Sequence, residues 1–346
     1  GQRDAMIYRY ACLMRGKGLE RPEIAALVEA YWRSRVTDKA TYTLAEAMIK
    51  VDQAMKHAPN NDAHDDLVVD DEDDESTKVG ASWGRVDLTA ILAGDDEPTL
   101  PTLMPRSDGV NLLYPGLVHS IHGESESGKS WIAQTECARL LAAGRPVLYV
   151  DNESDAKSVV ERLRLLGVTK EAISMHFDYR CPEASPLEDN AGWQDMLGGT
   201  YDLAIIDGVT DSLGLFGFGI KENDDVARWM KRFPRQLAKR SGAAVVLIDH
   251  VTKSSEGRGR FAIGGQAKMA GLDGAAYSVD VKSPLGKGLK GRLTIKVGKD
   301  RPGQVRGHGG KADASRMQHI ADYVLDSTGD APVATLWAPT ADDGDA

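Results

Sequence analysis

One short loop constrains this chain more than any other feature of its sequence. Residues 123–130 read GESESGKS, which places two glycines, a lysine and a serine at the spacing G-x-x-x-x-G-K-S. The apolar stretch 117–121 precedes the loop, and apolar residues at helical spacing follow it until Gly144 and Pro146. A strand, a glycine loop and a helix in this order predict a phosphate-binding loop, because backbone N–H groups and the helix dipole converge on anionic oxygens.

Each position of this loop has an expected role. Gly123 and Gly128 would let the backbone bend and come close to a phosphate chain. Lys129 would reach the β- and γ-phosphates of a nucleotide, and the Ser130 hydroxyl would bind Mg²⁺. The two acids of the loop are expected to point outward into solvent. The predicted nucleotide-binding set is Gly123, Glu124, Ser125, Glu126, Ser127, Gly128, Lys129, Ser130 and Trp131.

Two further motifs would place carboxylates beside the loop. The apolar run YDLAIIDG ends at Asp207, where a carboxylate at a strand tip would hold Mg²⁺ or its water shell. Gly208 stands where many phosphate-loop proteins carry the carboxylate that activates water. The strand VLYVDNES offers Glu153 for that role, with Asp151 as the substitute. The alternative for Glu153 is an ordinary acid near the start of the helix DAKSVVERLRLLG.

Strands and helices alternate from residue 117 onward, which predicts an α/β fold with a mostly parallel sheet. Residues 274–282 and 292–297 follow each other without room for a long helix, so antiparallel strands are expected at an edge. The predicted strands are 117–123, 146–151, 201–207, 243–249, 274–282, 292–297, 320–326 and 333–339.

The N-terminal part differs in kind from the rest. It is predicted to be a small all-α module of three short helices, the third opening with a capping box of Thr43 and Glu46. The stretch 62–75 that follows holds nine acids and no Lys or Arg. Such a run is typical of a disordered spacer, with mimicry of nucleic acid as the alternative. The predicted division is a helical module at 1–57, an acidic linker at 58–82, the α/β domain at 83–340 and an acidic tail at 341–346.

The charge distribution and the cysteines limit which partners and which cellular compartment are expected. The net charge of −10 is concentrated in the linker and the tail, so the remainder of the 346 residues is close to neutral and a nucleic-acid partner stays possible. No apolar run approaches the length of about 18 residues that a membrane span needs, and no signal peptide opens the chain. Three scattered cysteines without metal-ligand spacing suit a reducing cytoplasm.

The order of the motifs resembles a known family. GESESGKS, VLYVDNES, YDLAIIDG, VVLIDHVTK, FAIGGQAKMAGLDGAA and VGKDRPG occur between roughly residues 83 and 305. Together they resemble RecA-type ATPases of the hexameric helicase group, nearest to the RepA-like helicases of plasmids and phages. The resemblance implies a RecA-like fold, ATP and Mg²⁺ as cofactors, and Glu153 as the base. It also places Arg162 against the adenine and His250 as a polar sensor after the fourth core strand.

Helicases of this group carry a Lys-x-Arg pair that points into the ATP site of the neighbouring subunit. Lys299 and Arg301 in VGKDRPG match that spacing and would stabilise the charge on the transferring phosphoryl group. The alternative is a charged turn after an edge strand. The resemblance therefore implies a homo-oligomer, with a hexamer expected.

Two loops face the central channel in rings of this family and would contact single-stranded DNA. They correspond here to 211–225 and 251–265, both rich in glycine. Basic side chains among glycines suit the binding of a DNA strand whose phosphates must be held and then released. The alternative is a disordered surface loop. The basic residues predicted to contact DNA are Lys221, Lys253, Arg258 and Arg260. Phe216, Phe218 and Phe261 are candidates for stacking on DNA bases.

The resulting prediction is an ATP-dependent DNA helicase domain of a phage or mobile-element replication protein, working in the host cytoplasm if a phage encodes it. The helices of the N-terminal module are similar to those that follow primase–polymerase domains, which implies such a domain on the same parent chain. The alternative is a RecA-like ATPase that remodels or loads protein–DNA complexes without unwinding.

Overall fold

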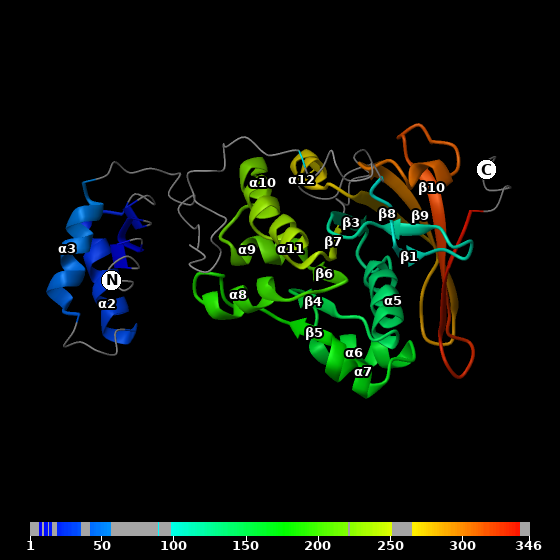
Figure 1. Cartoon of the computed structure of the whole chain (residues 1–346), viewed down its shortest axis with the longest axis horizontal. Coiled ribbons are helices and arrows are strands. Elements are labelled where there is room, and N and C mark those ends of the chain that lie inside the picture. Colours follow the sequence, from blue (N-terminus) through cyan, green and yellow to red (C-terminus); the bar gives the residue numbers. More distant parts are fainter. Residues whose placement is uncertain are drawn as a thin grey trace. The chain divides into compact units, whose positions relative to one another are not determined.

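The computed structural model describes residues 7–8, 10–12, 14–15, 19–35, 42–56, 89, 98–220, 222–250 and 265–339 (Figure 1). The chain divides into two units, Gly1–Gly94 and Asp95–Ala346. The predicted linker at 58–82 and tail at 341–346 lie outside the described residues, so their boundaries stay predictions. No helix in the described part of the chain has the length and apolarity needed to cross a membrane.

The first unit is helical, as the sequence predicts. Helix α2 (Arg21–Arg35) has Pro22 in its first turn, and helix α3 (Leu44–Ala54) begins after Thr43. The predicted capping box is present, because the Thr43 hydroxyl accepts from the Glu46 N–H and the Glu46 carboxylate accepts from the Thr43 N–H. Apolar side chains from both helices form a small core of their own.

A nine-stranded sheet forms the centre of the second unit (Figure 1). Its strands are β3 (Val118–Gly123), β4 (Val147–Asp151), β5 (Phe177–Arg180), β6 (Leu203–Asp207), β7 (Ala244–His250), β8 (Ala275–Ser283), β9 (Lys290–Asp300), β10 (Gln318–Asp326) and β11 (Val333–Trp337). They lie in the order β11-β10-β9-β8-β3-β7-β6-β4-β5. The strands from β8 to β5 are parallel, and β9, β10 and β11 extend the sheet as antiparallel strands.

All the predicted strands are present, with ends that shift by a few residues, and three further strands are not predicted. The strand predicted at 274–282 joins the parallel group, because β8 pairs in parallel with β3 and antiparallel only with β9. The unpredicted strands are β5 at one edge of the sheet and a separate two-stranded ribbon of β1 (Leu103–Pro105) and β2 (Asn111–Leu113). β5 reads FDYR and is only half-buried, so its apolar signal is weak.

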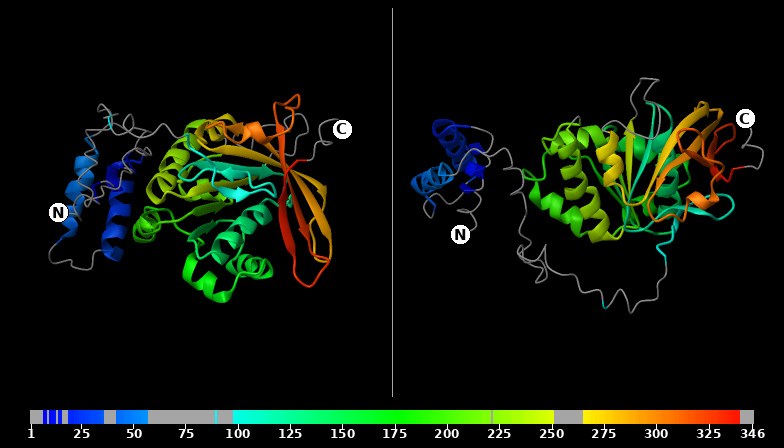
Figure 2. Two further views of the ribbon diagram at one scale, coloured as in Figure 1. Left: turned by 45° about the vertical axis from the view of Figure 1, so that its right-hand side comes forward. Right: turned by 90° about the horizontal axis from the view of Figure 1, so that it is seen from above.

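Helices cover both faces of the parallel strands (Figure 2). One face carries α5 (Lys129–Ala142), α6 (Ala156–Leu165) and α7 (Lys170–His176); the other carries α8 (Asn190–Gly198), α9 (Val209–Leu215), α10 (Asn223–Arg232), α11 (Pro234–Ser241) and α12 (Gly265–Gly271). Successive side chains of a strand point to opposite faces, so Tyr149 of β4 lies in one core and Val150 in the other. Because both faces are buried, β4, β6 and β7 are apolar up to their carboxyl ends, whereas β3 carries the buried polar residues His119, Ser120 and His122.

The register of the parallel strands brings the ends of distant motifs together. Asp151 of β4 pairs with Asp207 of β6, and Gly123 of β3 pairs with His250 of β7. All four residues end their strands at the same edge of the sheet. Open α/β sheets bind ligands at the carboxyl ends of their strands, so this edge is where a site is expected.

Candidate active site

The predicted phosphate loop joins the end of β3 to the start of α5. Gly128 has a φ of 81°, and a Cβ atom there would lie 2.7 Å from methyl carbons of Leu285 and Leu293. A Cβ atom at Gly123 would lie 2.8 Å from the Ser127 hydroxyl oxygen. Both positions therefore require glycine, Gly128 for its conformation as well as its space.

The Lys129 side chain folds back onto the loop. Its Nζ donates to the carbonyl of Gly123 at 3.1 Å and to that of Glu124 at 2.6 Å. Burial lowers the pKa of Lys129, and nearby carboxylates act against that shift. Glu124 and Glu126 are exposed, as predicted. Glu126 has a φ of 60°, a conformation that favours glycine and that is found most often at functional loops.

Asp207 and Ser130 come together below the loop. The Ser130 hydroxyl donates to Asp207 Oδ2 at 3.1 Å, and the Tyr149 hydroxyl donates to the same oxygen at 2.6 Å. Burial raises the pKa of the Asp207 carboxyl, and these two hydrogen bonds oppose the shift. A hydroxyl and a carboxylate are oxygen ligands of the kind that Mg²⁺ binds together with phosphate oxygens, and a cation there would keep the carboxylate charged. The residues present therefore fit the predicted Mg²⁺.

Two acids that follow β4 have different surroundings. Asp151 is buried and accepts from the backbone N–H groups of Glu153 at 3.1 Å and Ser154 at 2.7 Å, and from the Tyr179 hydroxyl at 2.9 Å. Its carboxylate thus fixes the turn after the strand. The Glu153 side chain is 47% exposed, and its Oε1 lies 3.2 Å from Nε2 of His250. The predicted base therefore faces the predicted sensor.

Gly208, which follows Asp207, is packed closely against the turn that carries Glu153. It has a φ of 82°, and a Cβ atom there would lie 3.2 Å from the Cβ atoms of Asn152 and Glu153. The Asn152 backbone N–H and side-chain amide both donate to the Asp207 carbonyl, at 3.0 Å and 2.9 Å. The turn that carries Glu153 is therefore packed against Gly208, and a side chain at that position would be crowded as well as strained by the positive φ.

A pocket of about 390 Å³ connects these groups. The Arg162 guanidinium lies over the Trp131 ring, 5.3 Å from its centroid, at the side of this pocket. A planar cation on an indole offers flat surfaces against which a purine can stack. The pocket lining includes the predicted residues Glu126, Ser127, Gly128, Lys129, Ser130, Trp131, Glu153, Arg162, Asp207 and His250.

Tyr149 and Asn152 lie within the motif VLYVDNES but are not among the predicted site residues. Tyr149 lies two residues before Asp151, so both point to the same face of β4, and that alternation is the one signal that relates it to the site. Asn152 has no comparable signal, because its partner is a backbone carbonyl on another strand.

Comparison with known proteins supports the chemistry that this geometry suggests. Residues 85–256 match a family model described as an AAA domain. A region of 183 residues is 30% identical to the DNA repair protein RadA of Brucella abortus (strain 2308). This region covers 50% of the chain and 37% of that protein, so the chain spans well under half of the length of this relative. The chain carries a P-loop ATPase domain of RecA type.

In the ATPase domain, Arg301 lies far from the phosphate loop of its own chain. Its backbone N–H donates to the Gly274 carbonyl, and the Gly274 N–H donates in turn to the carbonyl of Val118. Val118 and Gly123 are the two ends of β3, which are about 16 Å apart at the usual rise of a strand. The exposed Arg301 therefore lies near the amino-terminal ends of the parallel strands, whereas the ATP site lies at their carboxyl ends.

Lys299, the other half of the predicted pair, has partners within its own chain. Its Nζ donates to the carbonyls of Met269 at 2.5 Å and Leu272 at 2.8 Å, at the end of α12. Lysine suits this place because the carbonyl end of a helix attracts cations. A role of Lys299 in a neighbouring ATP site stays a prediction, and within its own chain it holds α12 in place.

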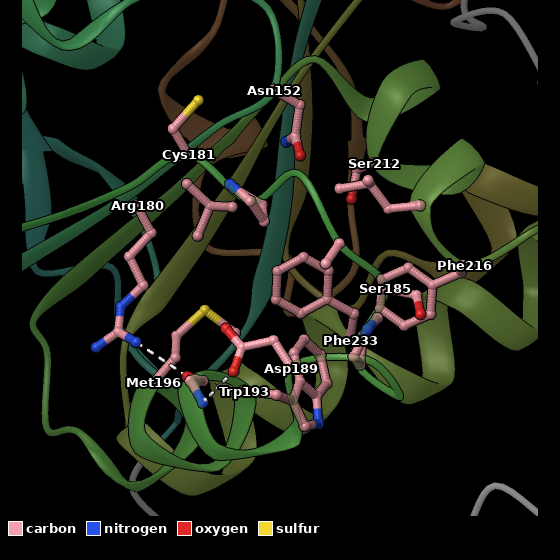
Figure 3. Close-up of a pocket in the computed structure, with 16 residues that line it drawn as sticks. Asn152, Arg180, Cys181, Ser185, Asp189, Trp193, Met196, Ser212, Phe216 and Phe233 are labelled. Atoms are coloured by element: carbon pink, nitrogen blue, oxygen red, sulfur yellow. Dashed lines mark hydrogen bonds between the residues drawn. The ribbon is translucent and has the colours of Figure 1, made fainter. Parts of the chain in front are cut away.

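The first predicted DNA loop of the ATPase domain is partly helical. Helix α9 takes up its beginning, so the prediction of an open loop from 211 is corrected. The Phe216 ring stacks against those of Phe218 and Phe233, with centroids 6.0 Å and 5.8 Å apart, and packs beside Trp193 at one side of a pocket of about 280 Å³ (Figure 3). Phe216 and Phe218 are thus packing residues rather than free stacking platforms. Lys221, Lys253, Arg258, Arg260 and Phe261 lie outside the described residues, and their contacts with DNA stay predictions.

Proposed function

We propose that the ATPase domain is a DNA helicase that assembles into a ring and moves along single-stranded DNA while it hydrolyses ATP. The observation that carries this proposal is the position of Arg301, at the edge of the sheet opposite to its own phosphate loop. An arginine there can complete an ATP site only on another copy of the chain. A head-to-tail contact of this kind closes into a ring when the rotation permits, and we expect a hexamer.

Within each site the residues of the chain would divide the work of hydrolysis. Lys129 and the N–H groups of the loop would hold the phosphates. Ser130 and Asp207 would hold Mg²⁺, which would supply positive charge beside the phosphates. Glu153 would accept the proton of the attacking water, and His250 would keep that carboxylate in place through its hydrogen bond. The arginine of the neighbouring copy would stabilise the charge on the transferring group.

The proposed contact with DNA uses the segment that follows His250. Residues 251–264 contain Lys253, Arg258 and Arg260 among glycines, and the relative RadA is named a DNA repair protein. Because His250 is hydrogen-bonded to Glu153, a DNA strand held by this segment would influence the ATP site through His250 alone. Phosphate contacts of this kind make binding fall with salt concentration.

The resemblance of the N-terminal helices supplies a context for this activity. We propose that the parent chain also carries a primase–polymerase domain and serves the replication of a phage or mobile element in the host cytoplasm. Detection of primer synthesis by the parent chain would test this proposal independently of unwinding.

Unwinding of a forked DNA substrate tests the main proposal. We expect ATP-dependent strand separation by the chain and none by Lys129→Ala, which lacks the phosphate-binding ammonium group. The second candidate function is an ATPase that remodels or loads protein–DNA complexes, and the similarity to a DNA repair protein favours it. Hydrolysis stimulated by single strands without any unwinding, under conditions where the ring is assembled, would support this second function and contradict the helicase.

A further inference from the structure

A buried ion pair lies close to the ATP site but on the opposite face of the sheet. Asp249 of β7 and Lys268 of α12 are 2.5 Å apart, measured from Oδ2 to Nζ. Their side chains are only 3% and 5% exposed. In some proteins, pairs buried this deeply are kept for the geometry that they fix rather than for stability.

The pair is connected to the site through the backbone of β7. The second oxygen of Asp249, Oδ1, accepts from the N–H of His250 at 2.9 Å. Neighbouring side chains of a strand point to opposite faces, so the His250 ring lies on the nucleotide side of the sheet. There its Nε2 is 3.2 Å from Glu153 Oε1 and its Nδ1 is 3.4 Å from the Ser125 hydroxyl. His250 thus connects the ion pair to Glu153, through its backbone N–H on one side and its ring on the other.

The charge that balances Asp249 comes from Lys268. His122 pairs with Asp249 in the register of β3 and β7 and is also buried. Burial, together with the charges of Lys129 and Lys268, lowers the pKa of His122 to about 4, so this imidazole is neutral near pH 7. The positive charge in hydrogen-bond contact with the Asp249 carboxylate is therefore the ammonium group of Lys268.

Helix α12, which carries Lys268, is itself held in place. The carbonyl end of the helix is held by Lys299, which donates to Met269 and Leu272, and by Arg235 of α11, whose Nε donates to the Gly271 carbonyl at 2.8 Å. These bonds anchor α12 to two other elements. The Lys268 ammonium group can therefore set the position of Asp249 rather than follow it.

We propose that Lys268 is a positioning residue for the reaction at Glu153: it holds Asp249, which fixes the peptide of His250 and so keeps the imidazole against the base. This inference rests on the proposed part of Glu153 in ATP hydrolysis and adds a residue that does not line the nucleotide pocket. It predicts that removal of Lys268 impairs turnover more than nucleotide binding.

The first test compares Lys268→Met with Lys239→Met, which removes an exposed cation from α11 but leaves Asp249 paired and α12 anchored. We expect kcat to fall about tenfold or more in Lys268→Met with KM changed less than about twofold, because a small misplacement of a catalytic group is costly. Lys239→Met should keep kcat within about twofold of the wild type. Unchanged kcat in folded Lys268→Met would overturn the proposal.

The second test asks whether Lys268 acts through His250. If it does, adding Lys268→Met to His250→Ala should cause no further loss, because the group being positioned is already absent. Losses that multiply in the double variant would show an independent effect and would overturn the proposal.

A third variant separates positioning from folding and from the proposed function. Asp249→Leu/Lys268→Met replaces the buried pair by apolar groups, a change that proteins often tolerate, and should lose the same activity while staying folded. NMR signals of the His250 ring, assigned with His250→Ala, should shift in this variant without any nucleotide. Unshifted signals would overturn the positioning role, whereas a wild type without Lys129-dependent hydrolysis would contradict the proposed function alone.

Discussion

At the scale of single residues, Asp151 and Glu153 show how surroundings assign different uses to the same functional group. Asp151 is buried, and its oxygens accept from two backbone N–H groups and from Tyr179. A carboxylate with that many partners has little capacity left for a proton from water. Glu153 is half-exposed in the nucleotide pocket and faces His250, so it is the acid that an attacking water can reach.

We expect Glu153→Gln to bind ATP normally and to hydrolyse it about 10²- to 10⁴-fold more slowly, because the change removes a general base but leaves the phosphate loop intact. Binding of a fluorescent ATP analogue and single-turnover hydrolysis would measure the two effects. Glu161→Gln, which alters an exposed acid on α6, is the matched control. Near-normal hydrolysis by Glu153→Gln would place the base elsewhere.

At the scale of elements, the turn after β9 is organised by one carboxylate. Asp300 Oδ1 accepts from the Tyr114 hydroxyl at 2.7 Å and the Gly303 N–H at 3.1 Å, and Oδ2 accepts from the N–H groups of Val305 and Arg306 at 2.8 Å and 2.9 Å. Arg301 therefore leaves the sheet from a fixed turn. A fixed donor loses less entropy when it meets a developing charge.

Asp300→Ala should lower the free energy of unfolding by about 1–3 kcal/mol, since it leaves several donors without their acceptor. It should also reduce ATP turnover toward the level of Arg301→Ala, because the turn that directs the arginine is loosened. Asp326→Ala at the end of β10, where a carboxylate caps another turn, is the control and should leave turnover unchanged. Full turnover in Asp300→Ala beside an inactive Arg301→Ala would mean that the rigid turn is not needed.

At the scale of the whole molecule, the distance between Arg301 and its own phosphate loop predicts that activity depends on assembly. Neither Lys129→Ala nor Arg301→Ala should hydrolyse ATP well alone. When the two are mixed into common rings, roughly a quarter of the interfaces should combine an intact loop with an intact arginine, so part of the activity should return. Steady-state hydrolysis across mixing ratios would measure this recovery. No recovery in rings shown to be mixed, or full activity of Arg301→Ala alone, would contradict a shared site.

Stability against acid is a second property of the whole molecule. Burial lowers the pKa of His119 and of His122 to about 4, and His119 Nδ1 already accepts from the Ala275 N–H, so a proton there would meet another donor. An unfolded histidine takes its proton near pH 6.5. The stability that the neutral rings contribute is therefore complete above about pH 6.5 and is lost as the pH falls toward 4, by at most about 3 kcal/mol for each ring.

Denaturant unfolding between pH 7.5 and pH 4.5 would measure this loss. His119→Gln, which keeps a donor and an acceptor, should flatten the dependence of the unfolding free energy on pH, and His308→Gln at an exposed position should not. An equal slope in His119→Gln and the wild type would show that this buried ring does not contribute.

The sequence by itself determined the features that depend on short-range geometry. The phosphate loop is recognisable because its glycines, lysine and serine act within one strand–loop–helix unit. The central strands at 147–151, 203–207 and 244–250 were predictable because burial on both faces makes them apolar up to the polar residues at their carboxyl ends. The edge strand β5 was not, since its side chains are only half-buried.

Only the tertiary structure decided how the distant motifs meet. It placed Tyr149 on Asp207, His250 on Glu153 and Lys268 on Asp249, and it moved Arg301 away from its own ATP site. These contacts depend on the register between strands that are far apart in the chain and on which face each side chain occupies. A shift of one residue in any strand would turn its side chains to the other face, and no spacing within a motif encodes that register.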